Sequence, residues 1–123
     1  MKLKALSLYA NVGIAETYFE KLGIEVVLAN ELIQNRCNFY KHLYPKSEMI
    51  QGDITKDDIK NEIITKAKEY GVNFIIATPP CQGMSTAGKN DPLDPRNQLV
   101  TYAIDIIKKI KPEFVLLENV PQQ

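Results

Sequence analysis

Five short apolar runs alternate with longer segments whose apolar residues recur at helical spacing, and this alternation limits the folds open to the chain. The expected strands cover residues 3–9, 24–29, 48–50, 72–77 and 113–117. The expected helices cover residues 14–22, 32–43, 56–70 and 97–110, and polar residues 88–97 are expected to form a surface loop. Such alternation is typical of a parallel sheet with right-handed crossovers. We therefore predict an α/β protein with a Rossmann-like, mostly parallel sheet, helices on both faces, and no strand after the fifth.

Composition limits the classes of partner. The chain has 123 residues, enough for one domain, and its 15 basic and 15 acidic side chains give no net charge. A basic field over the whole protein is therefore absent, and contacts to nucleic acid would have to come from local patches or from another domain. The two cysteines are far apart in the sequence and form no metal-binding spacing, which predicts a reduced, cytoplasmic protein without a metal site. No apolar run approaches membrane-spanning length, so we expect no membrane partner.

A polar or special residue follows each expected strand. These residues are Asn11 with Gly13, Glu31, Asp53, Cys81 and Glu118. The carboxyl ends of parallel strands meet at one edge of the sheet, where folds of this kind bind ligands. The glycine turn opens an expected helix, and an acidic residue after the second strand commonly accepts ribose hydroxyls. Only one glycine is present at this turn, which disfavours a dinucleotide as the ligand. The pattern predicts a nucleoside-binding crevice, although Glu31 could also serve as a helix N-terminal charge and Asp53 as a plain turn residue.

Two further residues suggest chemistry at the same edge. Cys81 follows the apolar run 74–77 and two prolines, which fix an extended exit from the strand. It could be a nucleophile or a buried structural cysteine. Glu118 ends the apolar run 114–117 and could donate a proton, hold an amidine-like edge, or simply be a hydrated residue at a strand end. Together they fit a nucleophile and an acid that face one substrate.

Six short motifs occur in an order that resembles the amino-terminal part of a DNA cytosine-5 methyltransferase. They lie at residues 7–13, 29–31, 52–54, 79–85, 94–99 and 118–120. The Pro-Pro-Cys-Gln element at 79–82 and the Glu-Asn-Val element at 118–120 are the most specific. The resemblance spans nearly the whole chain.

The resemblance implies a pocket for S-adenosylmethionine. In this family the loop after the first strand holds the cofactor, Glu31 would take the ribose hydroxyls and Leu32 would pack on the adenine. Asp53 and Ile54 would read the adenine edge. The residues that would complete the pocket are Tyr9, Ala10, Asn11, Gly13, Pro80 and Leu99.

The resemblance also implies a reaction on double-stranded DNA. Cys81 would attack carbon 6 of a cytosine flipped out of the helix, Glu118 would hold the ring nitrogen and amino group, and Asn119 would support the loop around Cys81. Four residues would contact DNA, although the two charged ones could be solvated loop charges: Gln82, Ser85, Lys89 and Arg96.

The chain departs from the family in the first loop and in length. Ser7, Asn11 and Ile14 replace the usual aspartate and glycines, and we expect Asn11 to keep the left-handed turn. Residues 1–123 would form the cofactor-binding and catalytic part, without a target-recognition domain. The fifth strand would then be an exposed edge that pairs with the missing carboxyl-terminal half or with a second copy. RNA cytosine as the substrate and a non-catalytic nucleoside-binding module remain open alternatives.

Overall fold

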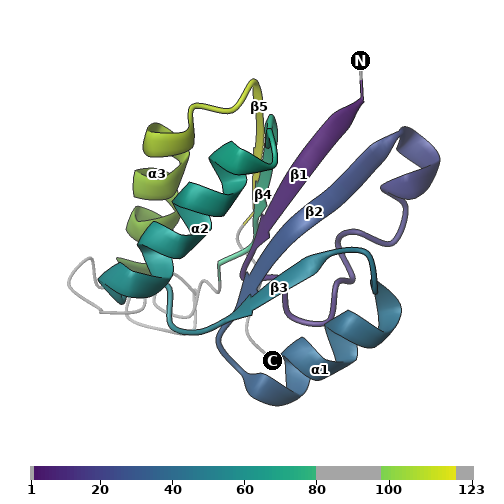
Figure 1. Cartoon of the computed structure of the whole chain (residues 1–123), viewed down its shortest axis with the longest axis horizontal. Coiled ribbons are helices and arrows are strands. Elements are labelled where there is room, and N and C mark those ends of the chain that lie inside the picture. The colour runs from purple at the N-terminus through teal and green to yellow at the C-terminus, as the bar shows by residue number, and fades with distance from the viewer. Residues whose placement is uncertain (1, 80–97, 119–123) are drawn as a thin grey trace, which may run out of the picture.

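The computed structural model describes residues 2–79 and 98–118, and it contains the predicted alternation of strands and helices (Figure 1). The strands are β1 (Leu3–Leu8), β2 (Ile24–Glu31), β3 (Glu48–Gln51), β4 (Phe74–Ala77) and β5 (Phe114–Leu117). The helices are the 3₁₀ turn η1 (Glu20–Leu22), α1 (Gln34–Leu43), α2 (Asp57–Glu69) and α3 (Gln98–Ile110). The bounds differ from the sequence prediction by at most two residues for every element except the first helix.

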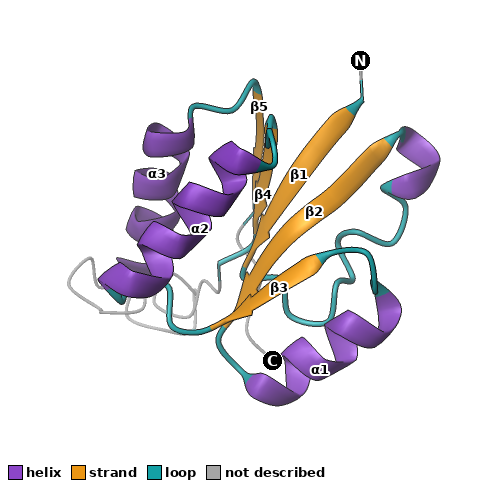
Figure 2. Ribbon diagram, in the orientation of Figure 1, coloured by secondary structure: helices purple, strands orange, loops and turns teal. Residues whose placement is uncertain are grey.

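The five strands form one sheet in the order β3-β2-β1-β4-β5, and every neighbouring pair is parallel (Figure 2). The chain moves outward from β1 to β3, then crosses back to the other side of β1 and continues outward to β5. The direction of winding therefore changes between β1 and β4. In open α/β sheets the ligand crevice lies at this switch point, outside the carboxyl ends of the strands.

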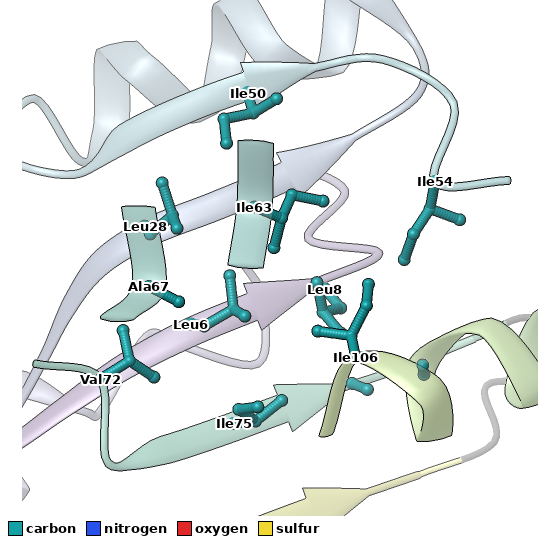
Figure 3. Close-up of a cluster of buried hydrophobic side chains, with 12 residues drawn as sticks. Leu6, Leu8, Leu28, Ile50, Ile54, Ile63, Ala67, Val72, Ile75 and Ile106 are labelled. Atoms are coloured by element: carbon teal, nitrogen blue, oxygen red, sulfur yellow. The ribbon is translucent and has the colours of Figure 1, made fainter. Parts of the chain in front are cut away.

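The main core lies between the sheet and the helices α2 and α3 (Figure 3). Side chains from β1, β2 and β4 alternate along their strands, so that one set faces this layer. The fully buried members of the cluster are Leu6, Leu8, Leu28, Ile63, Ala67, Ile75, Ala77, Ala103 and Ile106. Burying an aliphatic side chain of this size stabilises a fold by about 1.5–3 kcal/mol, so this layer fixes the position of the strand ends.

The opposite face of the sheet is covered by α1 and by the segment that precedes β2. Cys37 and Tyr40 of α1 are fully buried against Ala29 and Met49. Phe19 packs edge-on against Phe74, with ring centroids 5.9 Å apart. Helices on both faces of a parallel sheet confirm the predicted fold class.

Residues 14–22, predicted to be a helix, do not form one. Their backbone bonds join residues three apart, as in Glu16 N–H to the Gly13 carbonyl and Phe19 N–H to the Glu16 carbonyl, and only η1 is regular. The prediction relied on apolar residues at helical spacing, yet Ile14, Tyr18 and Leu22 are 67–76% exposed. Because these side chains bury little, packing does not favour a continuous α-helix there. Gly23 does end the segment as predicted, with φ of +77°.

β5 is an edge strand whose four residues are all exposed. The exposed fractions are 50% for Phe114, 45% for Val115, 39% for Leu116 and 41% for Leu117. Successive side chains point to opposite faces, so neither face of this strand is covered within the described part of the chain. Among the described helices, none combines the length and the apolar character needed to cross a membrane.

Candidate active site

The loop that leaves β1 turns through three residues with positive φ. Tyr9 has φ of +57°, Asn11 +54° and Gly13 +83°. A left-handed conformation costs a residue with a Cβ atom about 1–2 kcal/mol, and Asn tolerates it better than most. The expectation that Asn11 keeps the turn is confirmed. A strained Tyr9 is less common and requires interactions that hold it.

Only glycine fits at position 13 without a shift of the neighbouring side chains. A Cβ atom there would lie 2.3 Å from Cε2 of Tyr44 and 3.0 Å from Cε2 of Tyr40. The Tyr44 hydroxyl also donates a hydrogen bond to the Gly13 carbonyl at 2.6 Å. The loop after β1 is therefore seated on two rings at the carboxyl end of α1.

Glu31 ties this loop to the start of α1. Its side chain is only 6% exposed, Oε1 accepts from the Asn11 N–H, and Oε2 accepts from the Ile33 N–H, each at 2.9 Å. The sequence left Glu31 as either a ribose acceptor or a helix N-terminal charge. Ile33 is the residue just before α1, so this bond holds the entry to the helix and not an amide of its first turn. Each carboxylate oxygen has a second acceptor position, so further hydrogen bonds remain chemically open. Leu32 beside it is 57% exposed.

Asp53 stabilises the turn after β3. Its Oδ1 accepts from the Thr55 N–H at 2.9 Å and from the Thr55 hydroxyl at 2.8 Å. These bonds, the backbone one first, hold the pKa of Asp53 below its usual value. Oδ2 has no hydrogen-bond partner among the described residues. The turn alternative from the sequence is thus realised, and one ionised oxygen is left at the edge.

Asn30 is a functional candidate that sequence reasoning missed. It is 3% exposed, and its Nδ2 donates to the Ile50 carbonyl at 2.8 Å and to the Gly52 carbonyl at 3.2 Å. It therefore holds the exit from β3, where Asp53 lies. The available signal was a polar side chain at the end of a buried strand, next to the acid.

Ile54 and Leu99 differ in exposure. The Ile54 side chain is 5% exposed and belongs to the main core. Leu99 is half-buried in the first turn of α3, and its carbonyl accepts a hydrogen bond from the Tyr9 hydroxyl. The expected contact of Ile54 with the adenine edge and the expected place of Leu99 in the cofactor pocket stay predictions.

The ends of β4 and β5 lie side by side next to Tyr9. The Glu118 N–H donates to the Ala77 carbonyl at 3.0 Å. The Thr78 N–H donates to the Leu8 carbonyl at 3.3 Å, and the Thr78 hydroxyl donates to the Tyr9 carbonyl at 3.1 Å. The exposed Glu118 is therefore adjacent to the strand end that leads, three residues after Thr78, to Cys81. The other predicted site residues fall outside the described residues: Pro80, Cys81, Gln82, Ser85, Lys89, Arg96 and Asn119.

Glu16 is a buried carboxyl that the sequence pattern did not reveal. It is 3% exposed, and its Oε2 and the Tyr40 hydroxyl each lack a hydrogen-bond partner in the described part of the chain. Burial raises the pKa of Glu16, and the nearby hydroxyls of Tyr40 and Ser7 partly oppose this. No group of His, Cys, Asp and Glu able to hold a metal ion occurs within residues 2–79 and 98–118.

A parallel sheet that switches direction between β1 and β4, with acidic residues at its carboxyl edge, is typical of a doubly wound α/β protein that binds its ligand at this switch point. Residues 3–122 match the family model described as C-5 cytosine-specific DNA methylase, and the chain belongs to this family.

Relatives and solved structures agree with the family. Type II methyltransferase M1.HgaI of Avibacterium volantium is 44% identical over 97% of this chain and 35% of its own length. Type II methyltransferase M.NgoPII of Neisseria gonorrhoeae is 38% identical over 96% of this chain and 33% of its own length. A crystal structure described as a DNA modification methyltransferase encoded within an E. coli prophage superposes with a TM-score of 0.78 at 30% identity, over 98% of this chain and 32% of that one. The crystal structure of a Spodoptera frugiperda DNMT2 mutant superposes with a TM-score of 0.70 at 28% sequence identity, over 97% of this chain and 36% of that one. The chain spans about a third of the length of these proteins.

Proposed function

We propose that the protein transfers a methyl group from S-adenosylmethionine to carbon 5 of cytosine in double-stranded DNA. The observation that carries this proposal is the shared edge at the switch point. There the loop after β1, Glu31 and Asp53 lie at one group of strand ends. The chain leading to Cys81 leaves beside Glu118. The chain belongs to the C-5 cytosine-specific DNA methylase family, and the reaction in that description is one that residues at this edge could carry out.

The acidic residues at the edge fit an S-adenosylmethionine pocket. A nucleoside offers hydroxyl and amino donors, and Glu31 and the free oxygen of Asp53 are acceptors for such groups. We assign the ribose to Glu31, the adenine edge to Asp53 and Ile54, and the adenine face to Leu32. Tyr9, Ala10, Asn11, Gly13, Pro80 and Leu99 would line the rest. When bound, the cofactor would supply the methyl group and leave as S-adenosylhomocysteine.

Cys81 is proposed as the nucleophile. Its thiolate adds to carbon 6 of the flipped cytosine, and the electron pair moves to carbon 5, which becomes nucleophilic. Glu118 holds the ring nitrogen and amino group and offsets the charge that develops there. After methylation, loss of the proton on carbon 5 expels Cys81 and restores the ring. Asn119 supports the loop, and Gln82, Ser85, Lys89 and Arg96 contact the DNA backbone.

We also propose that residues 1–123 are the cofactor-binding and catalytic part of a larger unit. The chain spans about a third of its curated relatives, and a neutral chain has few groups for binding phosphates. Target recognition would then be supplied elsewhere. The exposed edge strand β5 is a suitable place for the carboxyl-terminal part of the enzyme to add, and a second copy of the chain is the alternative occupant. The curated relatives named above come from bacteria, in which DNA lies in the cytoplasm, so we place the protein there.

A methyl-transfer assay tests the proposal. The protein, purified at its natural length, is incubated with labelled S-adenosylmethionine and either unmethylated plasmid DNA carrying random inserts or RNA transcribed from it. We expect label in 5-methyldeoxycytidine, and none with the Cys81→Ser variant. Label in RNA alone would replace the DNA substrate with RNA. Cofactor binding without transfer to either would leave a non-catalytic nucleoside-binding module.

A further inference from the structure

Tyr9 is bonded to two chain segments that lie far apart in the sequence. Its carbonyl accepts a hydrogen bond from the Thr78 hydroxyl at 3.1 Å, just after β4. Its own hydroxyl donates to the Leu99 carbonyl in the first turn of α3. One residue at the end of β1 therefore joins the end of β4 to the start of α3, which both lie at the carboxyl edge of the sheet.

The conformation of Tyr9 indicates that these two hydrogen bonds help to hold the residue in place. The residue has a positive φ of +57°, which is strained for a bulky side chain. Such strain persists only where the surroundings determine the conformation, and it is concentrated at functional sites. Burial, followed by the charge of Asp53 and by Tyr102, raises the pKa of Tyr9, so its hydroxyl stays a neutral donor.

We propose that the Tyr9 hydroxyl is a positioning group that holds the first turn of α3 against the loop after β1. Through the same residue the Thr78 end of β4 is kept in register with that loop. The inference rests on the proposed function, since the elements joined in this way would carry the cofactor loop and lead to Cys81. The single hydrogen of the hydroxyl is already donated to the Leu99 carbonyl, so the hydroxyl cannot at the same time donate to the cofactor.

The substitution Tyr9→Phe removes the hydroxyl and keeps the ring. In the protein at its natural length we expect faster hydrogen exchange at the amides of the first two turns of α3. In the methyl-transfer assay on plasmid DNA we expect kcat to fall about fivefold, a loss typical of one hydrogen bond. KM for S-adenosylmethionine should stay within about twofold, because Phe keeps the ring and the backbone with which residue 9 would line the pocket.

Tyr70→Phe is the matched control. Tyr70 also loses a hydroxyl bond in this substitution, to Oε1 of Glu48 at 2.5 Å, but Glu48 begins β3 and lies at the opposite edge of the sheet. For Tyr70→Phe we expect no change in the hydrogen exchange of the α3 amides and no change in kcat. A second pair of variants tests the hydrogen bond from the Thr78 hydroxyl to the Tyr9 carbonyl. Thr78→Val removes this bond and should lower kcat as Tyr9→Phe does. Thr78→Ser keeps the hydroxyl, so its kcat should stay close to that of the wild type.

The outcomes separate this inference from the proposed function. If Tyr9→Phe behaves like Tyr70→Phe in both measurements, the positioning role is wrong. A raised KM for S-adenosylmethionine with unchanged kcat would place the hydroxyl on the cofactor and would also overturn it. If the wild-type protein transfers no methyl group, the proposed function fails, and hydrogen exchange in α3 alone then decides whether Tyr9 holds the helix.

Discussion

Glu16 is a buried carboxyl, whereas acidic side chains usually lie at the surface. A carboxyl that is 3% exposed, with one oxygen lacking a partner among the described residues, is costly to ionise. Burial raises its pKa in the folded protein, so the folded state binds this proton more tightly than the unfolded chain does. Stability from this group is therefore complete below its ordinary pKa of 4.5 and is lost as the pH rises through the folded-state pKa.

The substitution Glu16→Gln tests this assignment. Gln resembles the protonated carboxyl and cannot ionise, so we expect the variant to be more stable than the wild type at pH 8. The difference in unfolding free energy, measured in urea, should shrink as the pH falls toward 4.5. Glu20→Gln, which removes an exposed carboxylate from the same segment, is the matched control for the change in charge. A difference for Glu16→Gln that is constant across the pH range would mean that titration of Glu16 is not its cause.

The site residues show where sequence reasoning stops. Glu31 and Asp53 were predictable because strand ends of a parallel sheet share one edge, whatever the details of packing. Asn30 and Glu16 were not, because their environments are set by residues far along the chain. Asn30 bonds carbonyls 20 and 22 residues away. The hydroxyl of Tyr40, 24 positions along the chain, influences the pKa of Glu16.

At the scale of elements, the sequence predicted the sheet and three of the four helices. Strong apolar runs identify buried strands, and glycine at residues 23 and 71 marks element ends. The segment 14–22 was mispredicted because a helical pattern shows only that one face is apolar, not that this face is buried. Ile14 and Tyr18 remain exposed, and the Thr17 hydroxyl bonds the Ile14 carbonyl at 2.8 Å, which favours a local turn.

The β5 edge gives a prediction for the 123-residue chain studied alone. An exposed apolar edge strand is a template for pairing, so we expect the chain to elute from a size-exclusion column above its monomer mass. Leu116→Lys should shift it toward the monomer, because a charge on an edge strand opposes pairing. Ile104→Lys is the control, since Ile104 on α3 has nearly the same exposure, 38% against 39%. A monomeric wild-type chain at low concentration would contradict self-pairing.

At the scale of the whole molecule, the described residues form a five-stranded parallel sheet with one carboxyl edge. The chain spans about a third of the length of the curated relatives named above, and it contains the proposed cofactor loop and the proposed nucleophile. The described residues place the loop after β1, Glu31, Asp53, Thr78 and Glu118 along that edge. The central claim is that Cys81 performs covalent chemistry on cytosine at this edge.

Covalent trapping tests that claim most directly. Double-stranded DNA in which 5-fluorocytosine replaces cytosine is incubated with S-adenosylmethionine and the protein at its natural length. The fluorine cannot leave as a proton would, so the adduct at carbon 6 should persist through denaturing electrophoresis. We predict that peptide mass spectrometry finds the modified base on Cys81 and that Cys81→Ser forms no complex. An adduct on the buried Cys37, or no adduct from protein that binds both DNA and cofactor, would contradict the account.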